Sequence, residues 1–442
     1  MGKRRRKPLP EPAVGRIESL SPEGRGVTRV EGKTVFVSGA LPGETVRFEY
    51  RRSSRRYDEA EAIDIIEASP DRVEPACPHF GTCGGCSLQH LSAAAQIRLK
   101  ERALLDNLKH LGKVEAETIY APLTGPAWGY RRKARLGVRY VHKKGRVLIG
   151  FRERFSRYLA DMSVCPVLCP EVGENLGSLA ELIAGLSIRE RIPQIEVAQG
   201  DNATALVIRH LDPLIEGDRR QLIDWGEKYG IWMYLQAAGP DSVTRLSPGE
   251  GELSYHIDQG DIDITFLPSD FTQVNPVINQ QMIGRALEEL APEGEDHVVE
   301  FFAGLGNFTL PLARRAGRVT AIEGETGLVD RARANATNNG LVNIDFHVAD
   351  LSAVDMGENW QAALADCNQV LLDPPRSGAL ALLPAIAQGG ATRLLYISCN
   401  PATLARDAGE LVHRHGYRLK KAGVMDMFPH TAHVESMALF EK

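Results

Sequence analysis

Hydrophobic and polar positions follow three successive patterns along this chain. From Ala13 to Ile66, short β-rich runs alternate with turns, which predicts a small OB-like barrel of about five strands. From Tyr130 to about Ser269, predicted strands and helices mix without an internal repeat, which predicts an α/β domain. From about residue 270, apolar β runs alternate regularly with helical segments, which predicts a doubly wound and mainly parallel sheet.

These patterns divide the chain into four parts. We expect a basic N-terminal arm at residues 1–12, the barrel at 13–68, a central α/β domain at 69–269 and the regular α/β domain at 270–442. Pro70 and Pro75 mark a linker, and the span from Leu88 to Leu111 has helical spacing. The β runs of the last domain are His297–Phe302, Arg318–Glu323, Ile344–Val348, Gln369–Asp373, Arg393–Ser398, Tyr417–Met425 and Ser436–Phe440.

The near-neutral total charge conceals two basic segments. The 442 residues include 52 Lys and Arg against 57 Asp and Glu, a formal charge of −5. Residues 1–60 hold 14 basic against 8 acidic side chains, and residues 128–157 hold 11 against 1, so the remainder is acidic. A polybasic arm beside a basic barrel favours contact with RNA over a merely solvated surface.

No stretch of the sequence predicts membrane insertion. The longest run without a charged residue, 377–392, contains a proline and three glycines, whereas a spanning helix needs about 20 apolar residues. The polybasic start is followed by Pro8-Leu9-Pro10 instead of the apolar segment of a signal peptide. We therefore expect a cytoplasmic protein.

The spacing of the cysteines indicates a metal centre. The chain has seven, an odd number, and without an export signal this favours thiol or metal chemistry over disulfides. Cys77, Cys83 and Cys86 form a C-x5-C-G-G-C pattern, which fits a [4Fe–4S] cluster better than the paired C-x-x-C units of zinc sites. Cys165 and Cys169 are alternatives for the fourth ligand, and the other would remain a spare thiol.

The residues that follow the first three β runs of the last domain predict a nucleoside cofactor. Ligands of doubly wound sheets bind beyond the carboxyl ends of the strands. A glycine-rich turn at Gly304 follows the first run, and Glu323 ends the second run 19 residues later, the spacing at which a carboxylate binds ribose hydroxyls. Asp350, after the third run, is placed to accept the adenine amino group. Because the turn lacks the full G-x-G-x-x-G pattern, S-adenosylmethionine is favoured over a dinucleotide.

Two later β runs end in residues that bear on the type of reaction. One ends in Asp373-Pro-Pro-Arg376, and the arginine replaces the aromatic residue that amino-methylating enzymes carry there, which disfavours their reaction. The other ends at Cys399, a candidate nucleophile, because Asn400 suits a helix N-cap and Pro401 the first helical position. The positive end of that helix is expected to lower the pKa of the Cys399 thiol.

Together these motifs resemble the RNA uracil-5-methyltransferases over nearly the whole chain. The resemblance rests on Gly39–Glu44 in a TRAM-like barrel, the cysteine pattern, Phe271–Asn275, Gly306–Phe308, Asp373–Arg376, Ser398–Pro401 and His433–Met437. It is strongest to the members that act on 23S ribosomal RNA, since the barrel and the cluster distinguish these from the transfer RNA enzymes. The expected fold is a TRAM barrel, a central α/β domain with the cluster, and a Rossmann-like class I methyltransferase domain.

The resemblance also implies roles for single residues. Cys399 is expected to be the nucleophile and Glu435 the base. S-adenosylmethionine is expected to contact Gln273, Phe302, Asn307, Glu323, Asp350 and Asp373, and the cluster to be held by Cys77, Cys83, Cys86 and Cys165.

The implied reaction is methylation of carbon 5 of a uridine in 23S ribosomal RNA through a covalent Cys–uracil adduct, and no obligate protein partner is evident. Methylation of a transfer RNA is the first alternative. A non-catalytic RNA-binding protein of ribosome assembly is the second.

Overall fold

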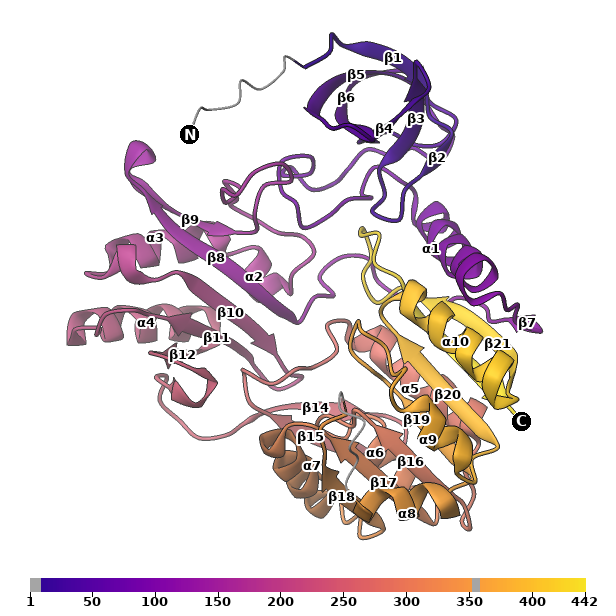
Figure 1. Ribbon diagram of the computed structural model, residues 1–442. Coiled ribbons are helices and arrows are strands. Elements are labelled where there is room, and N and C mark those ends of the chain that lie inside the picture. The colour runs from indigo at the N-terminus through magenta and orange to yellow at the C-terminus, as the bar shows by residue number, and fades with distance from the viewer. Residues whose placement is uncertain (1–8, 352–357) are drawn as a thin grey trace, which may run out of the picture. The chain divides into compact units, whose positions relative to one another are not determined.

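The computed structural model describes residues 9–351 and 358–442 (Figure 1). The chain divides into two units. The first unit consists of Met1–Lys100, Arg152–Tyr158 and Phe428–His433, and the second of Glu101–Phe151, Leu159–Met427 and Val434–Lys442. Most of the predicted N-terminal arm, residues 1–8, lies outside the described residues. Within the described part of the chain, every helix is too short or too polar to cross a bilayer.

A curled six-stranded sheet forms the core of the first unit, in the order β1-β5-β6-β4-β3-β2. Alternate residues of the strands point inward, and Val35, Val37, Val46 and Phe48 are completely buried. The expected five strands are six, because Ser19–Leu20 pairs as a strand too short to leave a sequence pattern. The strands are β1 (Ala13–Arg16), β2 (Ser19–Leu20), β3 (Gly26–Val30), β4 (Lys33–Ser38), β5 (Thr45–Ser53) and β6 (Tyr57–Glu67).

The Gly39–Glu44 motif is a structural turn of this barrel. Gly39 and Gly43 have φ angles of 80° and 83°, which favour glycine. The Glu44 carboxylate is completely buried, and it accepts hydrogen bonds from the Leu41 backbone N–H at 2.8 Å and from Arg72 Nε at 2.6 Å. This buried ion pair ties the barrel to the segment that follows it in the chain.

The predicted helix from Leu88 to Leu111 begins later than expected. Helix α1 spans Ala93–Asn107 and continues into a single π-helical turn, η1, at Leu108–Gly112. Leu88 and Leu91 are buried with Leu41 and Ala95 in a second small core. Their apolar spacing therefore results from the packing of a turn before α1 and does not indicate a helix.

A six-stranded mixed sheet, in the order β13-β12-β11-β10-β8-β9, lies in the second unit. The predicted helix from Val172 to Leu186 is broken at Glu174 into α2 and α3, and β12 and β13 were not predicted. The elements are β8 (Lys133–Val141), η2 (His142–Lys144), β9 (Arg146–Gly150), α2 (Pro170–Gly173), α3 (Leu176–Gly185), η3 (Arg189–Arg191), β10 (Gln194–Gln199), β11 (Thr204–Arg209), α4 (Glu216–Tyr229), β12 (Ile231–Gln236), η4 (Pro240–Ser242) and β13 (Val243–Arg245). A hairpin of β14 (Leu253–Ile257) and β15 (Ile262–Phe266) follows.

The predicted doubly wound sheet is confirmed in the same unit, in the order β18-β17-β16-β19-β20-β22-β21-β7. Its first five strands are parallel, β22 runs antiparallel between β20 and β21, and the two-residue β7 (Thr118–Ile119) adds an edge that the sequence did not predict. The strands are β16 (His297–Phe301), β17 (Arg318–Glu323), β18 (Ile344–Val348), β19 (Gln369–Leu372), β20 (Arg393–Ser398), β21 (Arg418–Met425) and β22 (Glu435–Glu441). The helices are α5 (Pro276–Leu290), α6 (Thr309–Ala313), α7 (Thr326–Asn338), α8 (Glu358–Asp366), α9 (Leu383–Gln388) and α10 (Pro401–His415).

Candidate active site

The carboxyl ends of four parallel strands meet at one edge of the sheet and carry most of the predicted site residues. Phe301 at the end of β16 pairs with Ile322 of β17 on one side and with Leu372 of β19 on the other, and Leu372 pairs with Tyr396 of β20. Phe302, Glu323, Asp373 and Cys399 therefore leave the sheet at the same edge. This is the edge at which ligands of such sheets bind.

The turn after β16 is shaped by backbone conformation and by Glu323. Phe302 has a φ angle of 66°, rare for a residue with a side chain, and Gly306 has one of 93°. The Gly304 N–H donates to Glu323 Oε2 at 3.0 Å, and the Gly324 N–H donates to Oε1 at 2.7 Å. The carboxylate is thus held in a fixed orientation at the place predicted for ribose.

The Asn307 side chain is fully engaged by neighbours that the sequence did not single out. Its amide exchanges two hydrogen bonds with the amide of Asn279, at 2.9 and 3.0 Å, and its Oδ1 also accepts from the Tyr255 hydroxyl at 3.1 Å. Asn307 therefore holds the turn against α5 and the β14–β15 hairpin. No sequence pattern pointed to Tyr255 or Asn279, since both read as ordinary positions of a strand and a helix.

The two remaining predicted cofactor residues lie in different surroundings. Gln273 is half-buried and lines a small hollow of about 40 Å³ together with Thr272, Tyr255 and Asn279. Asp350 is exposed at the end of the segment that follows β18.

The candidate base begins the strand beside the candidate nucleophile. Ser398 of β20 pairs with Ser436 of β22, and the Ser436 hydroxyl donates to the Ser398 carbonyl oxygen at 3.1 Å. Glu435, which precedes Ser436, and Cys399, which follows Ser398, therefore lie next to each other. Glu435 is 6% exposed, while Cys399 is half-buried and accessible.

Burial raises the pKa of two acids at this edge, Asp373 and Glu435. Burial raises the pKa of Asp373 to about 7. Burial, together with the Asp373 carboxylate, raises the pKa of Glu435 well above its ordinary value, while the Arg376 guanidinium opposes the shift. Two carboxyl groups that resist ionisation beside each other are typical of proton-transfer sites.

The expected lowering of the Cys399 pKa is wrong. Burial raises the pKa of the thiol, and the carboxylates of Glu435 and Asp373 raise it further, while Arg376 acts in the opposite direction. Asn400 is nevertheless the N-cap of α10, as predicted, and its Oδ1 accepts from the Ala402 N–H at 3.1 Å. The helix end is therefore present, while burial and the two acids raise the pKa of the thiol.

Hydrogen bonds join the loop of Asp373 to the loop of Cys399. Asn400 Nδ2 donates to the Arg376 carbonyl oxygen at 3.1 Å. Further along the first loop, the Ala379 N–H donates to Asp407 Oδ2 at 2.8 Å, and the Tyr396 hydroxyl donates to the same oxygen at 2.7 Å. Asp407 is completely buried, so this network fixes the two loops relative to each other.

The predicted cluster ligands are distributed over both units. Cys77, Cys83 and Cys86 lie in a glycine-rich loop of the first unit, where the Gly85 N–H donates to Cys83 Sγ at 3.4 Å. Cys165 and Cys169 lie in the second unit, and burial raises the pKa of Cys169 to about 12. Within the described residues, no group of three or more His, Cys, Asp or Glu side chains converges as a metal site.

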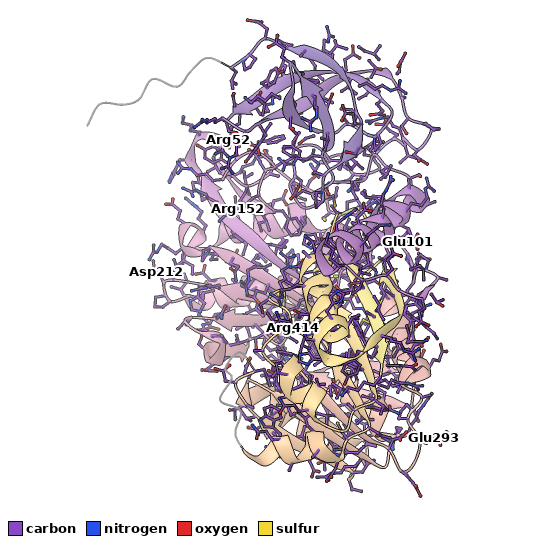
Figure 2. The ribbon with its side chains drawn as sticks, turned by 45° about the vertical axis from the view of Figure 1, so that its right-hand side comes forward. Arg52, Glu101, Arg152, Asp212, Glu293 and Arg414 are labelled. Atoms are coloured by element: carbon purple, nitrogen blue, oxygen red, sulfur yellow. The ribbon has the colours of Figure 1, made fainter. Side chains whose placement is uncertain are left out.

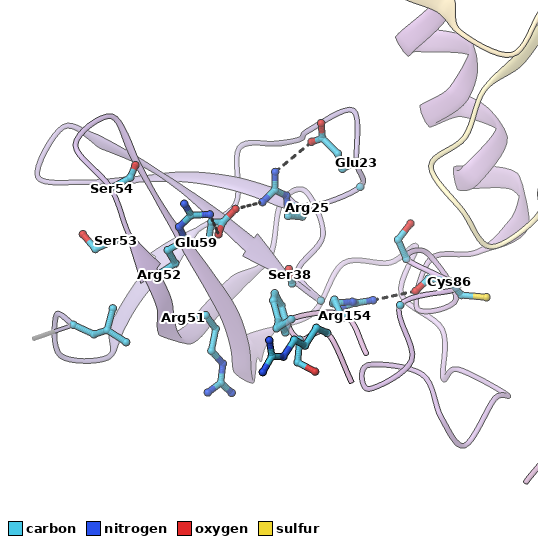
Figure 3. Close-up of a pocket in the computed structure, with 18 of the residues that line it drawn as sticks. Glu23, Arg25, Ser38, Arg51, Arg52, Ser53, Ser54, Glu59, Cys86 and Arg154 are labelled. Carbon is cyan, nitrogen blue, oxygen red and sulfur yellow. Dashed lines mark hydrogen bonds and ion pairs between the residues drawn. The ribbon is translucent and has the colours of Figure 1, made fainter. Parts of the chain in front are cut away.

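A large basic pocket lies within the first unit, and we call it the barrel pocket (Figure 3). Its volume is about 1500 Å³. Its lining includes the glutamates Glu23 and Glu59 and the cations Arg25, Lys33, Arg51, Arg52, Arg55, Arg154 and Arg157. Arg52 extends outward from β5 (Figure 2), and Arg154 donates to the Cys86 carbonyl oxygen at 3.2 Å.

Comparison with known proteins identifies relatives for the whole chain and for two parts of it. Residues 254–442 match the model of the tRNA (Uracil-5-)-methyltransferase family, and residues 16–63 match the TRAM domain. A 23S rRNA (uracil(1939)-C(5))-methyltransferase RlmD of Methylococcus capsulatus is 53% identical over 100% of both chains. The protein of the same name from Alkalilimnicola ehrlichii is 51% identical over 100% of this chain and 99% of its own.

A solved structure shares the fold of nearly the whole chain. The tRNA (uracil-54, C5)-methyltransferase of Pyrococcus abyssi, in complex with S-adenosyl-L-homocysteine, covers 97% of this chain and 100% of its own with a TM-score of 0.73 and 24% identity. The expectation that transfer RNA enzymes lack the barrel is therefore wrong for this one, so the barrel does not separate the two substrates. The N-terminal TRAM domain and the C-terminal methyltransferase fold are confirmed, and the full-length identity above 50% shows that the chain belongs to the 23S rRNA (uracil-C5)-methyltransferase family.

Proposed function

We propose that this chain transfers a methyl group from S-adenosylmethionine to carbon 5 of a uridine in 23S ribosomal RNA. The observation that carries the proposal is the placement of Cys399 and Glu435 at the adjoining ends of the paired strands β20 and β22, beside Asp373. The full-length relatives of the chain are named as methyltransferases of this uridine position in 23S ribosomal RNA. Such an enzyme works where ribosomal RNA is made and modified, which for a bacterium is the cytoplasm.

In the proposed reaction, Cys399 and Glu435 act in successive steps. The Cys399 thiolate adds to carbon 6 of the uracil, and the electron pair of the ring double bond moves to carbon 5 as an enolate. Carbon 5 then takes the methyl group, and the sulfonium of the donor becomes a neutral thioether. Glu435 removes the proton from carbon 5, and the electrons of that bond expel Cys399. The raised pKa of Glu435 makes its carboxylate a stronger base for this last step.

The methyl donor itself would be held by the turn after β16 and by the carboxylates at its rim. Glu323, already oriented by two backbone N–H groups, is suited to bind ribose hydroxyls. The positive sulfonium would favour the ionised form of Asp373, whose carboxyl group is otherwise hard to ionise. Gln273, Phe302, Asn307 and Asp350 complete the proposed contacts, and Asn307 acts by holding the turn.

An assay with two RNAs tests the function. Purified protein is incubated with labelled S-adenosylmethionine and either a 23S ribosomal RNA transcript or a transfer RNA transcript. We expect 5-methyluridine in the ribosomal RNA alone, located by mass mapping. Methylation confined to transfer RNA would instead support the first alternative, and the absence of transfer to both would support a non-catalytic RNA-binding protein.

The barrel pocket is proposed to hold RNA through phosphate contacts. Arg55 and Arg157, both exposed, make no ion pair with the residues that the structure describes, so their charges are available to phosphates. We expect Arg55→Ala or Arg157→Ala to weaken RNA binding and to reduce the slope of log affinity against log salt by about 0.7 for each contact. Filter binding over a salt series measures this slope. Arg47→Ala is the control, since Arg47 lies on the same barrel outside the pocket and pairs with Asp64.

A [4Fe–4S] cluster is proposed on Cys77, Cys83, Cys86 and Cys165. The donor chemistry fits, because a backbone N–H to a cysteine sulfur, as at Cys83, is a common support of cluster thiolates. Cys165 is the fourth ligand that the resemblance implies, and Cys169, a thiol whose pKa burial raises to about 12, is the alternative. Such a cluster would link cysteines that lie far apart in the sequence.

We expect protein purified without oxygen to be brown and to contain about four irons per chain. Cys165→Ser should remove the absorption and the iron, whereas Cys169→Ser should retain both. Colourless protein with one zinc would contradict the cluster, and the reverse order of the two variants would make Cys169 the ligand.

A further inference from the structure

The two faces of the central sheet differ in what covers them. Because side chains alternate along a strand, Leu136, Ile195, Val197 and Leu206 point to one face, and all four are buried. Helices α3 and α4 pack against the sheet (Figure 1). Gly226 of α4 approaches Met233, which pairs with Leu206 and so lies on this apolar face. The side chains at the alternate positions of each strand point to the opposite face.

That opposite face contains a hollow of about 400 Å³, which we call the sheet hollow. Strand register places Arg135 beside Glu196 and Glu196 beside Val207, and it places Gln194 beside Arg209 and Arg209 beside Gln236. Val207 is 2% exposed and forms an apolar floor among these polar side chains. The rim is completed by Ala238, Gly239, Pro240, Val243 and Ser269.

Two polar side chains of the sheet hollow lack hydrogen-bond partners among the described residues. Glu196 Oε1 accepts from Arg135 Nε at 3.0 Å and from Gln194 Nε2 at 2.8 Å, so these three satisfy one another. The guanidinium of Arg209 and the amide of Gln236 make no hydrogen bond with the residues that the structure describes, although Arg209 is half-buried and Gln236 only 8% exposed. The polar atoms of both side chains are not among the buried atoms without a partner, so they keep contact with the solvent of the sheet hollow and are available to the hydrogen-bonding groups of a ligand.

The chemistry of the sheet hollow fits one nucleotide of an RNA. Its volume lies in the range of small-ligand sites, about 300–1,000 Å³. A guanidinium binds phosphate or the edge of a guanine, a carboxamide reads the edge of a base, and an apolar floor packs against the base plane. The hollow also borders the basic strand β8, which carries Arg135 and Arg139 on this face.

We propose that the sheet hollow binds one unpaired nucleotide of the RNA substrate, separate from the uridine that is methylated, with Arg209 and Gln236 as its contacts. This inference rests on RNA being the substrate of the chain. The nucleotide would fix how the RNA lies on the enzyme, because single-stranded RNA is recognised through bases that leave the stack. The site would therefore contribute to affinity and to the choice of RNA, and would leave the chemical step unchanged.

Two substitutions test the contacts. Arg209→Gln removes the charge, and Gln236→Leu replaces the amide by an apolar group of similar volume that needs no partner. We expect each to weaken binding of a 23S ribosomal RNA fragment about tenfold in filter binding, with kcat at saturating RNA and the KM for S-adenosylmethionine unchanged. Gln236→Leu should also keep or raise the Tm, which a merely structural role of the amide would lower. Arg220→Gln is the control, because Arg220 lies on α4 and pairs with Asp224.

A crosslink identifies the occupant. With p-benzoylphenylalanine at position 238, an exposed rim residue, we expect irradiation to join the protein to one nucleotide of the RNA fragment. Unchanged RNA affinity in both variants, or a crosslink to protein alone, would overturn the proposal while methyl transfer by the wild type still upheld the function. If both variants lost RNA affinity and the crosslink formed, but the wild type transferred no methyl group, the nucleotide site in the sheet hollow would be supported and the proposed function contradicted.

Discussion

Cys399→Ala is expected to abolish methyl transfer, lowering the rate at least about 10⁴-fold, and to prevent any covalent RNA complex. Carbon 5 of uracil is a poor nucleophile until a thiolate adds to carbon 6, and the alanine side chain cannot add. We expect the Cys399→Ala variant to keep its fold, because the cap of α10 is supplied by Asn400 and not by Cys399. The measurement is transfer of label to RNA, followed by denaturing electrophoresis to detect protein–RNA complexes.

Cys399→Ser is the matched control for this prediction. Its hydroxyl has nearly the shape of the thiol but ionises far less readily, so transfer should also be lost while binding of S-adenosylmethionine is retained in both variants. If Cys399→Ala still methylated RNA, the covalent mechanism would be wrong. If it lost cofactor binding as well, the residue would have a structural role at this edge.

Glu435→Gln is expected to trap the reaction after methyl transfer. The amide keeps the size of the buried side chain but cannot take the proton from carbon 5, so a methylated protein–RNA adduct should accumulate. This adduct survives denaturing electrophoresis and carries the label, and multiple turnover should fall by about 10²- to 10⁴-fold. Release of methylated RNA at the wild-type rate would show that another group is the base.

The same substitution has an expected effect on the nucleophile. The Glu435 carboxylate contributes to the raised pKa of Cys399, so its removal should lower that pKa and form the thiolate at lower pH. Alkylation of the Cys399 peptide by iodoacetamide, followed by mass spectrometry over a pH series, measures the change. A midpoint at unchanged or higher pH in Glu435→Gln would mean that the two groups do not interact.

Local sequence patterns were sufficient to predict an element wherever its conformation depends on residues that are close in the sequence. Strands β16 and β19 at the centre of the methyltransferase sheet are mainly apolar runs in which every residue is buried. The strands of this sheet from β16 to β22 could be predicted to within a residue or two, and with them the edge where Glu323, Asp373 and Cys399 emerge. The cap at Asn400 is equally local, since it depends on Asn400 and its next few neighbours. By contrast, Leu88 and Leu91 are spaced as on a helix but lie in a turn. Their burial in a small core requires apolar residues at the same spacing as a helix face would, so the sequence pattern does not distinguish the two.

The sequence alone determined the barrel, the order of strands and helices in the last domain, and the residue types at its ligand edge, because each depends on periodicity or on turn chemistry within a few residues. Tertiary structure alone decided which of those residues meet. Glu435 lies beside Cys399 only because β22 inserts antiparallel next to β20. Burial raises the pKa of Cys399, and the carboxyl groups of Glu435 and of Asp373, which follows β19, raise it further. The amide pair of Asn279 and Asn307 and the unpartnered side chains of Arg209 and Gln236 likewise depend on contacts between distant segments, which no local spacing encodes.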